Sequence, residues 1–285
     1  MIPRTILFPT DFSGRCDRAR DRAIQLANEW RARLVLLHVQ NDPDPVDILD
    51  GRQVAEDRIH RRLREEVTTP DIHVETLIAT GDVSKAVLEA STACGADIIV
   101  TGISRHDEIG DFLIGTTVER IIRHAGTPVL VVKERTQHHY SRVMVATDFS
   151  ECSAQALRTA MAAFPGAEIT LVHAYHVPLE GLRGREGPAG ALQARIAFDL
   201  DTFLARINLP VSARDRLDIN VDYGEVCEVV RNHVKLSHTD LAVIGTHGRP
   251  ALATAILGSE ARAMLSSLDC DVLLVRQQAQ PDAAT

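Results

Sequence analysis

The sequence has little of what marks a membrane, secreted or nucleic-acid-binding protein. None of its apolar runs approaches the roughly 18 residues of a membrane span, and Met1-Ile2-Pro3-Arg4 leads into a strand pattern rather than a signal peptide. Its five cysteines are odd in number and scattered, which is typical of a reducing cytoplasm. The net charge of −8 comes without a basic stripe, so nucleic acid is not an expected partner.

Several motifs of catalysis are also missing. The chain has no Gly-x4-Gly-Lys-Ser/Thr loop, no Gly-x-Ser-x-Gly elbow, no Cys-x2-Cys pair and no His-Glu-x2-His helix. The first absence removes the lysine that bridges the terminal phosphates in P-loop enzymes. A site in this chain is therefore expected to bind better than it cleaves.

The chain instead contains two copies of one pattern. Ile6–Ser13 returns as Val143–Ser150, and both segments end in Thr-Asp-Phe-Ser. Two further pairs follow in the same order: Leu34–Val39 with Ile169–Ala174, and Gly81–Val83 with Gly224–Val226. With 45% hydrophobic residues, each half can bury a core. We therefore predict two homologous domains, residues 1–137 and 138–285, each of ordinary size.

Within each copy, short apolar runs alternate with helical patterns. Strands are predicted near residues 4–9, 33–39, 72–79, 97–102 and 128–132, and again near 142–147, 168–174, 217–222, 240–245 and 271–275. Buried runs separated by helices indicate a parallel sheet covered on both faces. The fold class is therefore α/β, with two tandem doubly wound five-stranded parallel-sheet domains. Such sheets bind ligands at the carboxyl ends of their strands.

A particular spacing of glycines follows the fourth strand of each copy. In the second copy, Gly245-Thr246-His247-Gly248 is followed after nine residues by Gly258-Ser259. The first copy keeps Gly102 and Gly115-Thr116, but Arg105 stands in place of the second glycine. Glycines let backbone N–H groups approach an anion, and the following helix adds its unpaired N–H groups and positive dipole end. A phosphate-bearing ligand is the first hypothesis.

Together these segments resemble the universal stress protein family in its tandem form. The Thr-Asp-Phe-Ser segments, the His-Val or His-Ala ends of the second strands and the glycine loops occur in order, twice, over nearly the whole chain. The resemblance implies a Rossmann-like, adenine nucleotide alpha hydrolase-like fold with strand order 3-2-1-4-5. It also implies that ATP and magnesium are the cofactors, with the glycine loop and its helix holding phosphates and ribose.

Carried onto this sequence, the resemblance implies one complete and one incomplete site. The site of the second copy comprises Asp148, Ala174, Gly245, Thr246, His247, Gly248, Arg249, Gly258, Ser259 and Glu260, the last mainly through its backbone. Asp148 is also the candidate magnesium ligand. The site of the first copy comprises Asp11, Val39, Gly102, Arg105, Gly115 and Thr116.

These residues also have structural interpretations that the sequence leaves open. Gly248 and Gly258 could be turn and helix-entry glycines. Ser259 and Thr116 could be N-caps, and Thr116-x-x-Glu119 reads as a capping box. The two aspartates, Asp11 and Asp148, could be partners of a helix dipole rather than ligands.

The histidines fall into two groups. His38 and His173 lie in apolar runs and are expected to be core residues rather than catalytic ones. His247 lies within the glycine loop, where contact with a ligand is expected but catalysis is not.

Arg105 predicts that the two copies are unequal. Its side chain either blocks the backbone's approach to a triphosphate or supplies a cation to a different anion. We favour the first, so ATP is expected mainly in the second copy. The predicted function is a nucleotide-dependent stress-response module with an unknown protein partner.

Two other functions stay open at this point. One is a slow ATPase, because magnesium and loop amides would still stabilise developing charge. The other is a scaffold that binds no nucleotide. The family resemblance also implies that the two domains pair through their last strands within one chain, and it leaves a further homodimer open.

Overall fold

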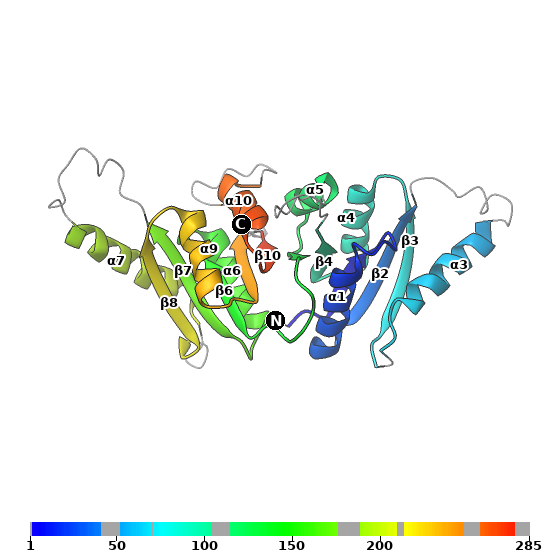
Figure 1. Cartoon of the computed structure of the whole chain (residues 1–285), viewed down its shortest axis with the longest axis horizontal. Coiled ribbons are helices and arrows are strands. Elements are labelled where there is room, and N and C mark those ends of the chain that lie inside the picture. Colours follow the sequence, from blue (N-terminus) through cyan, green and yellow to red (C-terminus); the bar gives the residue numbers. More distant parts are fainter. Residues whose placement is uncertain are drawn as a thin grey trace, which may run out of the picture.

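The computed structural model describes residues 2–40, 52–69, 71–103, 115–175, 189–209, 214–247 and 257–276. In this part of the chain, ten strands form one sheet with helices on both faces (Figure 1). The strand order is β3-β2-β1-β4-β5-β10-β9-β6-β7-β8. Each half is therefore a parallel, doubly wound, five-stranded unit, and the predicted fold class and the 3-2-1-4-5 order are confirmed.

The first half contains β1 (Thr5–Pro9), α1 (Asp17–Trp30), β2 (Arg33–Gln40), α3 (Arg52–Glu65), β3 (Val74–Thr80), α4 (Val83–Ala93), β4 (Ile98–Gly102), α5 (Thr116–His124) and β5 (Val129–Val132). The second half contains β6 (Arg142–Ala146), α6 (Glu151–Ala163), β7 (Glu168–Tyr175), α7 (Ala189–Ile207), β8 (Leu217–Tyr223), α9 (Val226–Leu236), β9 (Leu241–Gly245), α10 (Ser259–Ser267) and β10 (Asp271–Val275). Every strand begins and ends within about two residues of its predicted range.

Alternate residues of each strand enter two different cores. On β1, Ile6 and Phe8 belong to the core beneath α1, α6 and α7, whereas Leu7 belongs to the core beneath α4, α5, α9 and α10. All three side chains are fully buried. Burial on both faces explains why the strand sequences are continuously apolar rather than alternating.

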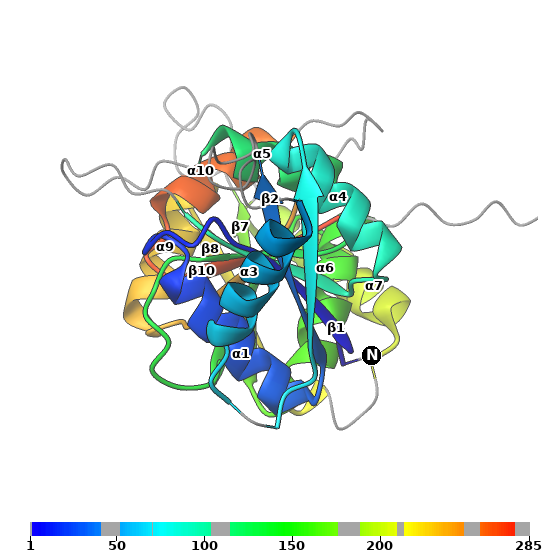
Figure 2. The same ribbon diagram turned by 90° about the vertical axis from the view of Figure 1, so that its right-hand side faces the viewer.

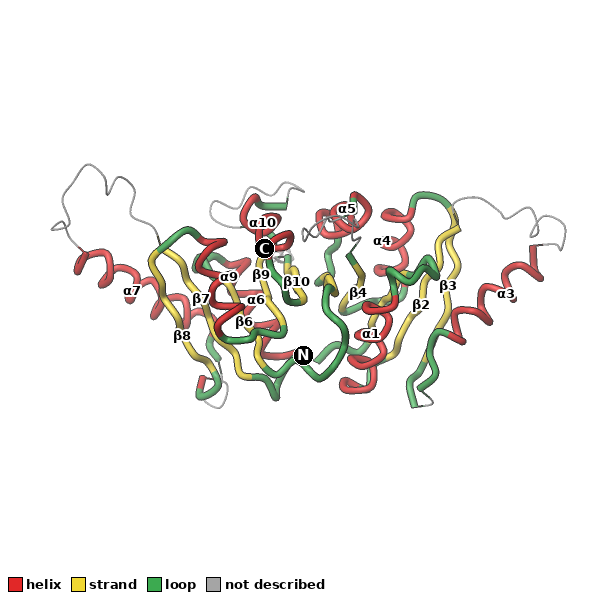
Figure 3. The backbone as a smooth tube through the Cα atoms, viewed as in Figure 1, coloured by secondary structure: helices red, strands yellow, loops and turns green. Residues whose placement is uncertain are grey.

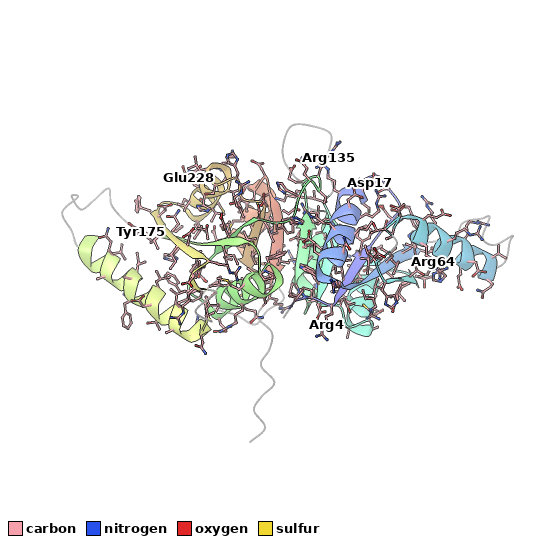
Figure 4. All side chains as sticks on the ribbon, turned by 90° about the horizontal axis from the view of Figure 1, so that it is seen from below. Arg4, Asp17, Arg64, Arg135, Tyr175 and Glu228 are labelled. Atoms are coloured by element: carbon pink, nitrogen blue, oxygen red, sulfur yellow. The ribbon has the colours of Figure 1, made fainter. Side chains whose placement is uncertain are left out.

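The helices α3 and α7 lie at the outer ends of the molecule, beside the edge strands β3 and β8 (Figures 1 and 3). Seen from below, Tyr175 and Arg64 lie toward these opposite ends, with Arg135 between them (Figure 4). Among the described helices, none combines the length and apolar character that a membrane crossing requires.

The two halves join through their last strands, as expected. β5 pairs antiparallel with β10, with Val131 opposite Val272 and Leu130 opposite Leu273. This pairing turns two five-stranded sheets into one. It also places α5 beside α10 on one side of the molecule in both perpendicular views (Figures 1 and 2).

A buried carboxylate reinforces this seam. Asp271, at the start of β10, is fully buried, and its Oδ1 accepts hydrogen bonds from Lys133 N at 2.7 Å and Glu134 N at 3.0 Å. Its Oδ2 accepts one from Tyr140 Oη at 2.6 Å and lies 3.4 Å from Arg22 Nε. A carboxylate from the second half is thus satisfied by donors from the segment between β5 and β6 and by the charge of Arg22 in α1, as a buried charge requires.

The backbone of Lys133 bonds Asp271, while its side chain lies elsewhere in the seam. The ammonium is fully buried and donates to Leu268 O at 2.6 Å. Burial lowers the pKa of Lys133 from 10.5 to about 8, and the nearby Cys270 and Asp271 partly oppose this shift.

Replacing Asp271 by alanine is expected to destabilise the protein strongly. The change leaves Arg22 without its buried counter-charge and three donors without their acceptor, which costs about 3–5 kcal/mol of unfolding free energy. Urea unfolding followed by circular dichroism measures this loss. Asp269→Ala is the matched control, because that side chain is 65% exposed and should contribute no more than about 0.5 kcal/mol. Equal effects of the two changes would contradict the proposed role of Asp271.

Lys133→Met is expected to change how stability depends on pH. Between about pH 8 and 10.5 the folded wild type has lost a proton that the unfolded chain keeps, so the contribution of Lys133 to stability rises with pH. From pH 7 to pH 10, the wild type should therefore gain roughly 2–3 kcal/mol relative to the variant. The quantity to measure is the difference in unfolding free energy between the two proteins at each pH. Burial raises the pKa of Cys270 and Tyr140, so these groups lower stability as the pH rises, and they do so in the wild type and the variant alike. A difference that is constant with pH would contradict this assignment.

Candidate functional site

The described candidate residues of the second half gather at one edge of the sheet. Asp148 follows β6, Ala174 lies near the end of β7, and Gly245 ends β9. Because β7, β6 and β9 are parallel neighbours, these ends lie in a row. Gly258 joins them, since its N–H donates to Thr246 O at 3.0 Å. Ser259 and Glu260 begin α10, His247 follows Thr246, and Gly248 and Arg249 lie outside the described residues.

The first half repeats this arrangement. Asp11 follows β1, Val39 lies near the end of β2, and Gly102 ends β4. Gly115 and Thr116 stand at the start of α5, and Arg105 lies outside the described residues.

The first glycine of each loop has a packing role. A Cβ added to Gly245 would lie 2.9 Å from Cys152 Sγ, at the start of α6. A Cβ added to Gly102 would lie 3.0 Å from the backbone oxygen of Arg15, next to α1. These glycines let the end of a strand approach the neighbouring helix closely.

The helices that follow the loops begin without a side-chain cap. Gly258 is the N-cap of α10 and Gly115 is the N-cap of α5, and neither helix receives a side-chain cap hydrogen bond. The alternative that Ser259 and Thr116 are N-caps is therefore wrong, because each is the first residue within its helix. The capping box predicted with Glu119 is absent for the same reason.

Three other helices begin with a side-chain N-cap, which α5 and α10 lack. The side chains of Asp82, Ser150 and Glu225 cap α4, α6 and α9. The α1 helix is also uncapped, but Cys16, its N-cap, is already in the helical region and its N–H donates to Ser13 O at 2.9 Å. Among the described residues, the first turns of α5 and α10 therefore keep backbone N–H groups that no N-cap side chain occupies, at the sheet edge where ligands bind in such folds.

A strained turn carries the candidate aspartate. Phe149 has a φ of 61°, a left-handed conformation that bulky residues rarely adopt. Its N–H donates to Thr147 Oγ1, and Ser150 N donates to Asp148 Oδ1, both at 3.0 Å. The His173 ring stacks on Phe149 at 4.1 Å, and its Nδ1 lies 2.8 Å from Thr147 O. His173 thus fixes the turn rather than performing chemistry.

The first half contains the same arrangement of a left-handed phenylalanine and a histidine ring. Phe12 has a φ of 59°, its ring lies 4.5 Å from His38, and His38 Nδ1 lies 2.9 Å from Thr10 O. The expectation that both strand histidines have structural roles agrees with these contacts. A donated N–H at Nδ1 also fixes the tautomer of each ring.

The environment of Asp11 keeps it ionised. Partial burial opposes ionisation, but hydrogen bonds from Ser13 and Cys16 outweigh it and hold the pKa of the carboxyl below its ordinary value. Its Oδ1 accepts Ser13 N at 2.8 Å and Cys16 Sγ at 3.2 Å. Because α1 begins only at Asp17, the helix-dipole alternative applies to Asp17 rather than to Asp11.

One group of side chains in the described part of the chain could hold a metal ion. Ligand atoms of Glu225, Cys227 and Glu260 lie within 4.8 Å of one another, between the first turns of α9 and α10. Asp148 is not part of this group. Burial raises the pKa of the Cys227 thiol to about 12, helped by its hydrogen bond to Glu260 and the nearby carboxylates. The thiol therefore stays protonated, which disfavours it as a metal ligand at neutral pH.

One polar contact between the two helices was not predicted. Arg262 of α10 forms an ion pair with Glu119 of α5. Its signal is present in the sequence, because both residues stand four positions after the glycine that closes the loop. Recognising the pair requires knowing that the two helices face one another.

Two segments of the chain match one family model. Residues 3–133 and residues 139–276 each match the model of the universal stress protein family. The chain belongs to the universal stress protein family. It is a tandem member, because the two matches together span nearly all of the sequence.

Individual relatives of this universal stress protein agree with the assignment. It is similar to a universal stress protein of Mycobacterium tuberculosis H37Rv, with 26% identity over 243 residues that cover 80% of this chain and 77% of the relative. A solved universal stress protein from Archaeoglobus fulgidus DSM 4304 has a TM-score of 0.67 and 17% identity, over 96% of this chain and 98% of its own. A Pseudomonas aeruginosa PAO1 protein described as functionally unknown has the same TM-score and 21% identity, over 97% and 93%. At these identities the solved structures show a shared fold.

Gly245→Ala is expected to destabilise this universal stress protein through a steric clash. The new methyl group would press on Cys152, and overpacking of this kind costs about 1–3 kcal/mol of unfolding free energy. Cys152→Ala should recover part of that loss in the double variant. Gly126→Ala is the control, since nothing lies within 4 Å of its added Cβ and stability should be unchanged or slightly higher. Additive effects of the Gly245 and Cys152 changes in urea unfolding would refute the clash.

Proposed function

We propose that this universal stress protein binds ATP with magnesium, mainly in its second domain, and that nucleotide occupancy alters its contacts with a protein partner. The observation that carries the proposal is the first turn of α10. Its N-cap is glycine, which offers no capping side chain to the first-turn N–H groups in the described part of the chain, and it stands at the carboxyl end of β9. Such a terminus attracts phosphate through both hydrogen bonding and the helix dipole.

The neighbouring strand ends fit the nucleoside part of the ligand. Ala174 packs with the core that α9 and α10 cover, and its small side chain leaves room at the sheet edge. Asp148 lies on a turn whose shape is fixed by Phe149 and His173. A preorganised carboxylate at this place supports contact with adenosine or with a bound magnesium ion.

The preference for the second domain rests on the two loop sequences. Gly248 permits close approach of the backbone to phosphates, whereas Arg105 places a long cationic side chain at the matched position. Binding rather than turnover is proposed because the sequence has no Gly-x4-Gly-Lys-Ser/Thr loop, whose lysine bridges the terminal phosphates in P-loop enzymes. His247, the nearest histidine in sequence, is hydrogen-bonded through Nδ1 to Thr246 Oγ1 at 2.9 Å.

Calorimetry with MgATP tests this proposal. We expect about one ATP bound per chain and a higher melting temperature, because a hundredfold excess of ligand over Kd stabilises the native state by about 2.7 kcal/mol. Gly258→Val should abolish binding, since a β-branched side chain would stand between the phosphates and the helix terminus. Gly115→Val, the matched change in the first domain, should leave binding intact.

Several outcomes would decide against the proposal. No binding by the wild type at millimolar MgATP would favour a scaffold, and two equivalent sites would remove the preference for the second domain. Turnover above the buffer rate that disappears in Gly258→Val would make the protein a slow ATPase. A Cβ at position 258 would lie 3.3 Å from Thr246 O, a tight contact that could disturb the fold. Circular dichroism of Gly258→Val must therefore match the wild type before a loss of binding is attributed to the site.

A further inference from the structure

The two domains carry opposite charges at one equivalent helix position. Glu119 is the fourth residue of α5, and Arg262 is the fourth residue of α10. The two side chains form an ion pair across the seam, close to the starts of both helices. A pair of identical domains would place like charges here, so the contact depends on the divergence of the two copies.

Each partner of this ion pair has a different surrounding. The carboxylate of Glu119 is 24% exposed and also accepts a hydrogen bond from Arg123 at 2.6 Å, within its own helix. The backbone oxygen of Arg123 accepts a hydrogen bond from Arg276 at 3.0 Å, which ties the end of α5 to the residue after β10. Arg262 is 48% exposed. If Arg262 swung away, Glu119 would keep Arg123, so separating the pair does not leave a lone buried charge.

A cation beside the α10 terminus would strengthen its hold on a triphosphate, in addition to the proposed magnesium. Arg262 is the only basic residue in the sequence of α10, and it stands in the same first turn as the N–H groups proposed to bind phosphate. Glu260 brings a negative charge to the same turn, and its Oε2 lies 3.4 Å from Cys227 Sγ. Arginine suits the task because its guanidinium can bond two phosphate oxygens at once.

We propose that Arg262 is a cation that the second domain supplies to the phosphates of a bound nucleotide, and that Glu119 of the first domain competes with the nucleotide for it. This inference rests on the proposed function of the same site. Binding then exchanges an ion pair between domains for one between Arg262 and phosphate. The first domain thereby sets the affinity of the second, and nucleotide binding releases a contact between α5 and α10.

Calorimetry on four full-length proteins tests the competition: the wild type, Arg262→Met, Glu119→Gln and the double variant. Arg262→Met should weaken MgATP binding by roughly tenfold or more, as expected for loss of a charge-assisted contact. Glu119→Gln should strengthen binding several-fold, because it frees Arg262. In the Arg262→Met background, Glu119→Gln should have no effect, since nothing remains to be freed.

Two controls make the result specific. Arg142→Met removes the same charge from a side chain of similar exposure, 45%, which pairs with Asp240 at the far end of β6 from Asp148, and binding should not change. Arg262→Met should weaken the binding of ATP more than that of AMP, because a general structural effect would weaken both equally.

The possible failures are distinguishable. If the wild type binds no MgATP, the proposed function fails together with this inference. If the wild type binds and Gly258→Val does not, but Arg262→Met keeps the wild-type affinity, the inference alone is wrong. It is also overturned if Glu119→Gln weakens binding, or if it strengthens binding equally with and without Arg262.

Discussion

The antiparallel pairing of β5 with β10 is the constraint on which the rest of the molecule depends. Each of these strands would otherwise be the edge of a five-stranded sheet, with a row of unpaired backbone groups. Their pairing removes both edges and brings a carboxylate of one half among the donors of the other, so that Asp271 is buried with its hydrogen bonds satisfied. The same pairing fixes α5 beside α10, and the starts of these two helices therefore belong to one side of a single body.

In each half, the turn after the first strand depends on one phenylalanine in a left-handed conformation. The chain turns sharply in this strained conformation, beside an aspartate at the carboxyl edge of the sheet. Such strain persists only where surrounding contacts compensate for it. The histidine of the second strand, whose ring lies against the phenylalanine, supplies those contacts in both halves, which explains why the Thr-Asp-Phe-Ser segment and the strand histidine recur together.

A tandem chain can differ between its halves in ways that a symmetric dimer cannot. The pair formed by Glu119 and Arg262 joins unlike residues at equivalent positions, and the loop sequences also differ, with Arg105 in the first and Gly248 in the second. The ion pair between Glu119 and Arg262 lies near the starts of α5 and α10 rather than in the cores. The fold therefore keeps an almost symmetric framework, while the charges around its two helix termini are free to diverge.

The sequence by itself determined the repeat, the family, the ten strands and the positions of the glycine loops, because apolar runs and glycine spacing are local patterns that burial and backbone geometry impose. It could not locate α3, whose apolar face is limited to Ala55, Ile59 and Leu63 among many charges. Only the tertiary structure decided that Gly245 makes room for Cys152, that glycines cap α5 and α10, and that Arg262 meets Glu119. Each of these facts joins residues that are distant in the chain, and contacts of that kind depend on how the elements pack rather than on any spacing within one segment.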